Sequence, residues 1–270
     1  MWYICFMAKI QEQLQNNSTP LLVLLLIAAA FFIGRLSSQV EALKTTAGGN
    51  TPQPAAQVAG AQPKEAVISM DQIKGLFKED LIKLGDEKSK VIFVEVSDPS
   101  CPFCHVAAGN DVVGNFTTVA KGGSYVPPVQ EIEKLVKAGK ASFVWIYQNG
   151  HGNGELATKA LYCANEKGKF WEAHNVMFTD EGYKLINNVV KNEKTKSGEL
   201  ASFLKQAVDE KFMKQCLDSG KYDARLNGDV AIAGKLGVNG TPGFFVNNTK
   251  FAGAVSYTSG MENTVNGALK

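Results

Sequence analysis

The sequence predicts an α/β protein in which a long helical block is inserted into a mixed sheet, and two observations support this prediction. Apolar stretches of strand length recur at residues 91–97, 141–147, 243–247 and 250–254. Between the second and third of these strands, apolar residues recur at helical spacing. This order of elements indicates one α/β domain with a helical insertion at about 155–220.

The folded part is expected at 66–270, and its first elements lead to a short motif. Apolar residues at helical spacing predict a helix over Met70–Leu84, with Asp71 as its candidate N-cap. The apolar strand 91–97 follows, and the turn at 98–100 leads from it into a second helix.

The later elements complete the predicted sheet. The stretch 121–140 combines a loop rich in Gly and Pro with a short helix over Val129–Ala138, and its purpose stays open. A helix over Tyr222–Leu236 returns the chain to the sheet, and another at Met261–Leu269 ends it. The last two strands form a hairpin across Asn247-Asn248, which makes the sheet mixed.

The first 65 residues indicate a membrane anchor and a linker. Residues 20–36 contain an uninterrupted apolar run and reach the lower length limit for a membrane span. No small-residue cleavage site follows, so an uncleaved anchor is favoured over a cleaved signal peptide. Residues 1–19 are then a short cytoplasmic N-terminus, in which Met7 is an alternative start. Residues 37–65 are rich in Ser, Ala, Gly, Thr, Gln and Pro, a composition typical of a flexible linker.

Composition excludes some functions. The net charge of +2 and the absence of a basic run argue against a nucleic-acid partner. Five cysteines are too few for a disulfide-built scaffold but suffice for a redox pair and one structural bridge.

The tetrapeptide Cys101-Pro102-Phe103-Cys104 directly follows the first strand, and it indicates a redox site. A cysteine at a helix N-terminus meets unpaired N–H groups and the helix dipole, which stabilise its thiolate. Cys101 is therefore the expected nucleophile and the more exposed thiol, with Cys104 as its disulfide partner. Half of a zinc site is the alternative. The other cysteines (Cys5, Cys163 and Cys216) have no Cys or His two to five residues away, so no metal is expected.

A second motif lies far downstream. The Thr241-Pro242 bond enters an apolar strand and is a candidate cis peptide, with an ordinary trans turn as the alternative. Together with Glu95, the cysteine pair and the run Gly168–His174, it makes the chain resemble the thioredoxin superfamily and, within it, the DsbA-like disulfide oxidoreductases. The resemblance covers roughly residues 66–270 and implies a thioredoxin-like fold with an inserted helical domain.

The resemblance also implies roles for residues. Glu95 would assist proton transfer at the buried cysteine; the alternative is a strand residue that faces solvent. The residues expected to contact substrate are Pro102, Phe103, Thr241, Pro242 and His151, the last in a loop after the second strand. His105 is expected to be a solvated helix residue and His174 a packed core histidine.

Cys163 and Cys216 both fall in the helical insertion. Two cysteines in one exported domain tend to pair, so a structural disulfide is expected, with two buried free thiols as the alternative.

These observations predict a membrane-tethered, extracytoplasmic thiol–disulfide oxidoreductase that forms disulfides in exported proteins through Cys101 and Cys104. Its expected substrates are reduced or unfolded exported proteins, and a membrane redox partner would reoxidise it. A single-pass location in the cell membrane, a monomer and no cofactor are expected. Two alternatives stay open: a thiol reductase on the same fold, and a non-catalytic binding module or chaperone.

Overall fold

A five-stranded mixed sheet lies at the centre of this computed structural model, which describes residues 67–114, 116 and 124–270. All of these residues belong to one unit, Pro63–Lys270. The predicted N-terminus, anchor and linker (1–19, 20–36 and 37–65) lie outside the described residues. Within the described part of the chain, no helix has the length and apolar character needed to cross a membrane.

The sheet has the strand order β1-β3-β2-β4-β5. Its strands are β1 (Ile82–Leu84), β2 (Ile92–Ser97), β3 (Ser142–Tyr147), β4 (Gly243–Val246) and β5 (Thr249–Ala252). The central pair β2 and β3 is parallel, and the other neighbours are antiparallel, so the predicted mixed sheet is confirmed. Every residue of β2 and β3 is buried, as expected for strands that are covered on both faces.

The helix predicted over Met70–Leu84 is wrong in its second half. Helix α2 (Met70–Gly75) continues into the short 3-10 turn Leu76–Lys78, and Ile82–Leu84 then forms the edge strand β1. The N-cap is Ser69, not Asp71: its hydroxyl accepts a hydrogen bond from the Gln72 backbone. Because pairing with β3 is a long-range contact, helical spacing in the local sequence did not reveal this strand.

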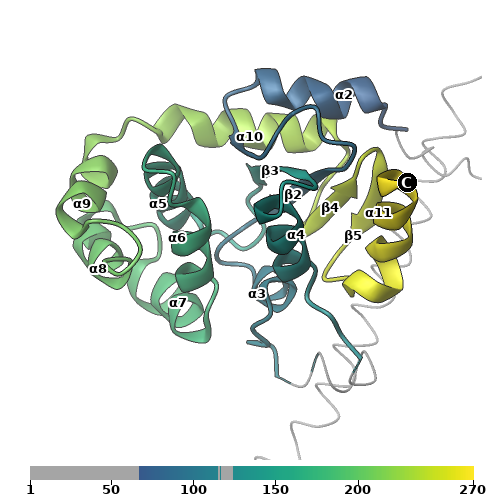
Figure 1. The fold of residues 1–270 in the computed structure, drawn as a ribbon. Coiled ribbons are helices and arrows are strands. Elements are labelled where there is room, and N and C mark those ends of the chain that lie inside the picture. The colour runs from purple at the N-terminus through teal and green to yellow at the C-terminus, as the bar shows by residue number, and fades with distance from the viewer. Residues whose placement is uncertain (1–66, 115, 117–123) are drawn as a thin grey trace, which may run out of the picture. The chain divides into compact units, whose positions relative to one another are not determined.

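Two layers of helices cover the sheet (Figure 1). On one face, α2 and α10 (Asp223–Lys235) pack against alternate side chains of the strands. On the other face lie α3 (Pro102–Ala108), α4 (Pro128–Lys137) and α11 (Glu262–Leu269), the last preceded by a π turn at Tyr257–Met261. Figure 1 shows that the helical block between β3 and α10 stands to one side of the sheet.

The helical block consists of short helices. They are α5 (Glu155–Glu166), α6 (Phe170–Met177), α7 (Asp180–Lys184), a π segment at Leu185–Val190, a 3-10 turn at Lys194–Lys196, α8 (Ser197–Phe203) and α9 (Glu210–Ser219). Gly168 separates α5 from α6, and its φ of +65° is one that glycine adopts without strain. The block packs against α3 and β3 through one continuous apolar core.

Candidate active site

The cysteine pair occupies the start of α3. Cys101 is the N-cap residue of this helix, Pro102 is its first helical residue, and Cys104 lies one turn further along. Both cysteines are free thiols, and both are buried. Neither thiol exposes surface to solvent, although fewer protein atoms surround Cys101 than Cys104. The Cys101 thiol donates a hydrogen bond to the carbonyl oxygen of Thr241 at 3.3 Å, and this contact covers the sulfur.

The two thiols differ in acidity. A hydrogen bond from the Cys104 thiol lowers the pKa of Cys101 to about 6, despite the opposing effect of burial. The Thr241 side chain and the charge of His151 act in the same direction. Burial raises the pKa of Cys104, and its contact with Cys101 raises it further. Near neutral pH a thiolate is therefore favoured on Cys101 over Cys104.

Thr241-Pro242 faces the cysteine pair because of the strand pairing. The bond is cis, which confirms the prediction. Strand β4 begins directly after it and runs antiparallel to β2, with Gly243 opposite Val96. The start of β4 thus lies beside the end of β2, where the turn to Cys101 begins. Sheet register brings together two motifs that are 140 residues apart in the sequence.

Glu95 is buried in β2 and does not face solvent, so the solvent-facing alternative is wrong. Its side chain shares one face of the strand with Phe93 and Ser97, and its exposed fraction is 0%. Burial raises the pKa of its carboxyl to about 7. Neither carboxyl oxygen forms a hydrogen bond of ordinary geometry, although the Ser97 hydroxyl lies close enough to moderate this rise in pKa.

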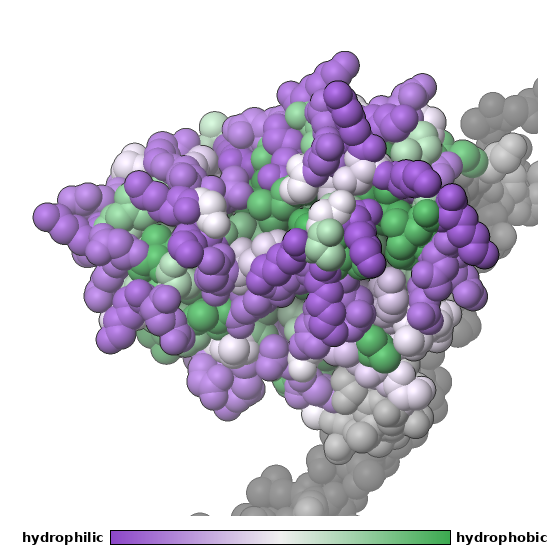
Figure 2. All heavy atoms as spheres, viewed as in Figure 1, coloured by the Kyte–Doolittle hydropathy of each residue, from purple (hydrophilic) through white to green (hydrophobic). Residues whose placement is uncertain are grey.

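An apolar hollow adjoins the cis-proline loop. The Phe103 side chain is 37% exposed, and its ring lies 5.4 Å from that of Phe116. These rings and Thr241 line a hollow of about 310 Å³, together with residues 252–255 at the end of β5 and directly after it. Figure 2 shows hydrophilic side chains over most of the visible face, with apolar residues exposed in small separate areas. Phe116 belongs to no motif identified in the sequence. Only the folded chain places it beside Phe103.

Asp98 is a site residue that the sequence did not single out. Its carboxylate is buried and accepts four hydrogen bonds. One oxygen accepts from the backbone N–H and the hydroxyl of Ser100, at 2.8 and 2.7 Å. The other accepts from the backbone N–H groups of Gly150 and His151, both at 2.8 Å. Asp98 thereby joins the turn before Cys101 to the loop after β3, where His151 is exposed.

The other two histidines are buried. The prediction that His105 is solvated is wrong: it faces inward on α3, and its ring lies 4.9 Å from that of Phe178. The ring of His174 also stacks on Phe178, at 4.1 Å, and His174 is buried, which confirms a packed core histidine. Burial lowers the pKa of His105, and it lowers the pKa of His174 to about 3. His174 is therefore neutral near neutral pH, and burial disfavours the charged form of His105.

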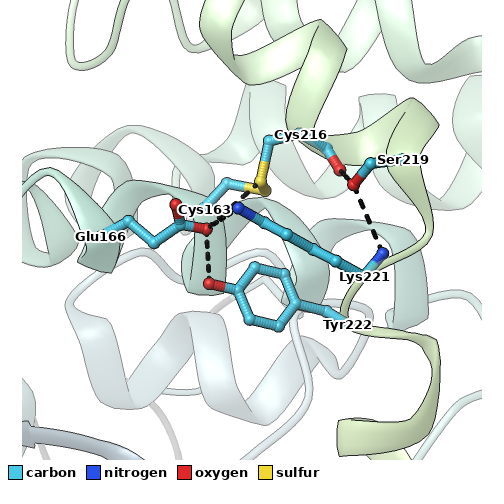
Figure 3. The surroundings of a disulfide bond; sticks show 6 residues. All are labelled: Cys163, Glu166, Cys216, Ser219, Lys221 and Tyr222. Atoms are coloured by element: carbon cyan, nitrogen blue, oxygen red, sulfur yellow. Dashed lines mark hydrogen bonds and ion pairs between the residues drawn. A yellow bond between two sulfur atoms is a disulfide. The ribbon is translucent and has the colours of Figure 1, made fainter.

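Cys163 and Cys216 form a disulfide that links α5 to α9 (Figure 3). The predicted pairing is confirmed, and the alternative of two free thiols is wrong. Glu166 lies beside it, 3.6 Å from the Cys216 sulfur, and its carboxylate binds the Lys221 ammonium and the Tyr222 hydroxyl. Both sulfurs are engaged in the disulfide, so they are not available as ligands for a metal ion.

A thioredoxin-like sheet, a Cys-x-x-Cys at a helix start and a facing cis-proline define a class of protein, the thiol:disulfide oxidoreductases. Comparison with known proteins agrees with this assignment. Residues 129–265, about half of the chain, match the family described as thioredoxin; the match includes Thr241-Pro242 and begins after the cysteine pair. The crystal structure of Wolbachia pipientis α-DsbA1 has a TM-score of 0.53 at 19% identity, over 70% of this chain and 91% of that chain. The chain therefore belongs to the thioredoxin family, and its fold is similar to that of α-DsbA1.

Sequence relatives differ in how much of their length is shared. A Rickettsia typhi protein, provisionally named a protein-disulfide oxidoreductase, is 25% identical over 241 residues, which are 89% of this chain and 79% of that protein. A Na+/H+ antiporter of Salinispora tropica is 24% identical over 172 residues, which are 63% of this chain. The chain spans 22% of the antiporter's length, so that match concerns a small part of a longer protein.

Proposed function

We propose that this protein oxidises pairs of thiols in exported proteins and that Cys101 is its reactive cysteine. The observation that carries the proposal is the difference in acidity between the two thiols. A Cys101 pKa of about 6 stabilises the reduced protein as a thiolate at neutral pH. Stabilising the reduced form makes the disulfide form a stronger oxidant, so the direction favoured is oxidation of the substrate.

The reaction begins with the Cys101–Cys104 disulfide. A substrate thiolate attacks the Cys101 sulfur, the bond to Cys104 breaks, and Cys104 leaves and takes up a proton. A second substrate thiolate then attacks the substrate sulfur of this mixed disulfide, and Cys101 leaves as a thiolate. The substrate has lost two electrons and gained a disulfide, and the protein holds two electrons as a dithiol. A membrane redox partner accepts these electrons and restores the disulfide.

Proton transfer at Cys104 is the role proposed for Glu95. Cys104 has a raised pKa, so it is released in its protonated form. A carboxyl with a pKa of about 7 holds or gives up a proton near neutral pH. Ser97 influences the acidity of both Glu95 and Cys104, which supports a position for the carboxyl close to this thiol.

The substrate is proposed to bind as an extended segment beside the cis-proline loop. Backbone groups of Thr241 and Pro242 would pair with the segment, as in strand addition. Pro102, Phe103 and the apolar hollow would accept its side chains. An incoming sulfur reaches Cys101 only when the contact with the Thr241 carbonyl opens.

Membrane tethering is proposed from the sequence. Residues 20–36 would anchor the chain as a single span, and a coil of residues 37–65 would reach roughly 30 Å from the membrane. The Cys163–Cys216 disulfide supports an oxidising, extracytoplasmic compartment for the folded domain.

The equilibrium reduction potential of the Cys101–Cys104 pair against glutathione tests the direction. We expect a potential above that of the glutathione pool in the cytosol, together with catalysed oxidation of a reduced test peptide. A potential near that of thioredoxin, about −270 mV, would instead favour the reductase alternative.

A further inference from the structure

The turn before the reactive cysteine is buried, and each of its three backbone carbonyls has a hydrogen-bond partner. Residues 98–100 connect β2 to α3, and all three are buried. The Asp98 carbonyl accepts the backbone N–H of Cys101 at 2.9 Å. The other two carbonyls accept hydrogen bonds from side chains, one from His105 and one from Asn187. Because a buried carbonyl without a partner is costly, these two side chains help to set the conformation of the turn.

Asn187 holds the peptide bond that leads into Cys101. Its side-chain amide donates to the Ser100 carbonyl oxygen at 3.2 Å. At the other end of the same peptide, the Cys101 N–H donates to the Asp98 carbonyl. The peptide plane is therefore held on both sides. Since this plane and the φ of −80° at Cys101 determine where the cysteine side chain begins, both hydrogen bonds bear on the position of the sulfur.

The Asn187 amide is itself fixed at both ends. Its nitrogen donates to the Tyr183 carbonyl at 3.1 Å as well as to the Ser100 carbonyl. Its oxygen accepts from the Asn153 amide at 3.2 Å, so a reversed amide would place oxygen against two carbonyl oxygens. The Asn153 backbone N–H also donates to the Ser100 hydroxyl, at 3.3 Å. One side chain thus joins the helical block, the turn before Cys101 and the loop after β3.

The segment that carries Asn187 has an unusual backbone. It is the π segment Leu185–Val190, and π turns within helices are frequent at functional sites. The two residues after it have φ values of +44° and +63°, in the left-handed region that residues other than glycine rarely adopt. The second of them, Asn192, donates its side-chain amide to the Gly152 carbonyl at 2.6 Å. Two asparagines therefore attach this segment of the helical block to the loop after β3.

His105 reaches the same turn from α3, and the helical block holds its ring. A carbonyl oxygen only accepts, so Nε2 of His105 donates to the Pro99 carbonyl, at 2.8 Å. The ring centroid lies 4.9 Å from that of Phe178 and 5.1 Å from that of Tyr183, both in the helical block. The two carbonyls that accept from side chains therefore both depend on the helical block.

We propose that Asn187 is a positioning residue of the active site, which holds the Ser100–Cys101 peptide so that the two thiols of the redox pair stay side by side. Asn153 keeps its amide in the donating orientation. Without Asn187, the buried Ser100 carbonyl turns toward another donor and takes Cys101 with it. The disulfide with Cys104 then closes less readily, because the proximity of the two sulfurs is no longer set in advance. This inference rests on the proposed function only in taking these two cysteines as the redox pair.

The test measures how readily the disulfide closes. In oxidised full-length protein, reduced glutathione attacks the Cys101 sulfur and Cys104 leaves; in the reverse step Cys104 attacks and glutathione leaves. After an acid quench, peptide mass spectrometry measures closed disulfide and mixed disulfide, and it separates an adduct on Cys101 from one on Cys5. At a fixed glutathione concentration, Asn187→Ala should lower the ratio of closed to mixed disulfide about threefold, as loss of one hydrogen bond of ordinary strength allows.

Two further variants separate positioning from a general effect on the fold. Asn188→Ala is the matched control, because Asn188 is the next residue of the same π segment and is exposed, and it should leave the ratio unchanged. Asn153→Ala keeps Asn187 but removes the amide that orients it. It should lower the ratio by a smaller factor, and it should have no effect in the Asn187→Ala background. The single Asn153→Ala variant also tests the inference if Asn187→Ala does not fold.

A wild-type ratio in Asn187→Ala would overturn the inference. A lower free energy of unfolding in urea, with that ratio unchanged, would mean that Asn187 only stabilises the fold. An unchanged ratio in Asn153→Ala, or an equal effect of this change in both backgrounds, would overturn the role of Asn153. Each ratio is compared with that of wild type whether the pair acts as an oxidant or a reductant. Failure of the proposed oxidase function would therefore leave this result standing.

Discussion

Replacing Glu95 by Gln should stabilise the protein, and the gain should depend on pH. Glu95 is buried in β2, and its two carboxyl oxygens form no hydrogen bond of ordinary geometry. Its pKa is about 7 in the folded protein, compared with 4.5 for an ordinary glutamate. The side chain keeps its proton in the folded state over a range of pH in which the unfolded chain releases it.

The sign and size of the effect follow from this difference in pKa. Because the unfolded state gains stability by ionising above pH 4.5, the free energy of unfolding falls as pH rises from 4.5 to 7. Compared with a glutamate whose pKa does not change on folding, Glu95 lowers the free energy of unfolding by about 3 kcal/mol at pH 8 and about 1 kcal/mol at pH 5. The side chain introduced by Glu95→Gln cannot ionise, so the stability of this variant relative to wild type should rise by roughly 2–3 kcal/mol from pH 5 to pH 8.

Urea unfolding of the reduced proteins at pH 5 and pH 8 measures this difference. Comparing one variant with wild type at two pH values cancels the cost of burying the amide itself. Glu87→Gln, at an exposed position, is the control and should show no pH-dependent difference. The reasoning is refuted if the stability difference between Glu95→Gln and wild type is the same at both pH values.

Three further predictions concern other residues. Cys104→Ser should accumulate a mixed disulfide with a reduced test peptide while Cys101→Ser should not, as mass spectrometry would show; faster alkylation of Cys104 than Cys101 at neutral pH would contradict the assignment. His174 has a folded pKa of about 3, so it stays neutral while the unfolded chain binds a proton below pH 6.5. Between pH 7.5 and 5, His174→Phe should therefore lose about 2 kcal/mol less stability than wild type in urea titrations, and equal losses would show that His174 contributes nothing. Replacing both Cys163 and Cys216 by Ala should lower the free energy of unfolding by roughly 3–4 kcal/mol and leave the potential of the Cys101–Cys104 pair unchanged. A changed potential would show that the two disulfides are coupled.

The sequence alone was sufficient to predict features that depend on residues close together in the chain. The segments at residues 91–97 and 141–147 are mostly apolar, and their composition predicts buried strands. The hairpin at Asn247 follows from turn chemistry, and the structure gives this residue a φ of +54°. Cys101 and Cys104 indicate a redox site, because forming a disulfide between them requires only that they lie one helical turn apart.

Only the tertiary structure decided features that depend on contacts between distant segments. Ile82–Leu84 has helical spacing but is a strand, because β3 provides a pairing edge. His105 is polar and follows the motif, yet it is buried because α6 and α7 cover that side of α3. Asp98 and Phe116 carry no local signal, and they become site residues only when the loop after β3 and the Phe103 ring are brought against them. Local sequence patterns reflect contacts a few residues apart, whereas the hydrogen bonds from Cys101 to Thr241 and from Gly150 to Asp98 join segments more than 50 residues apart.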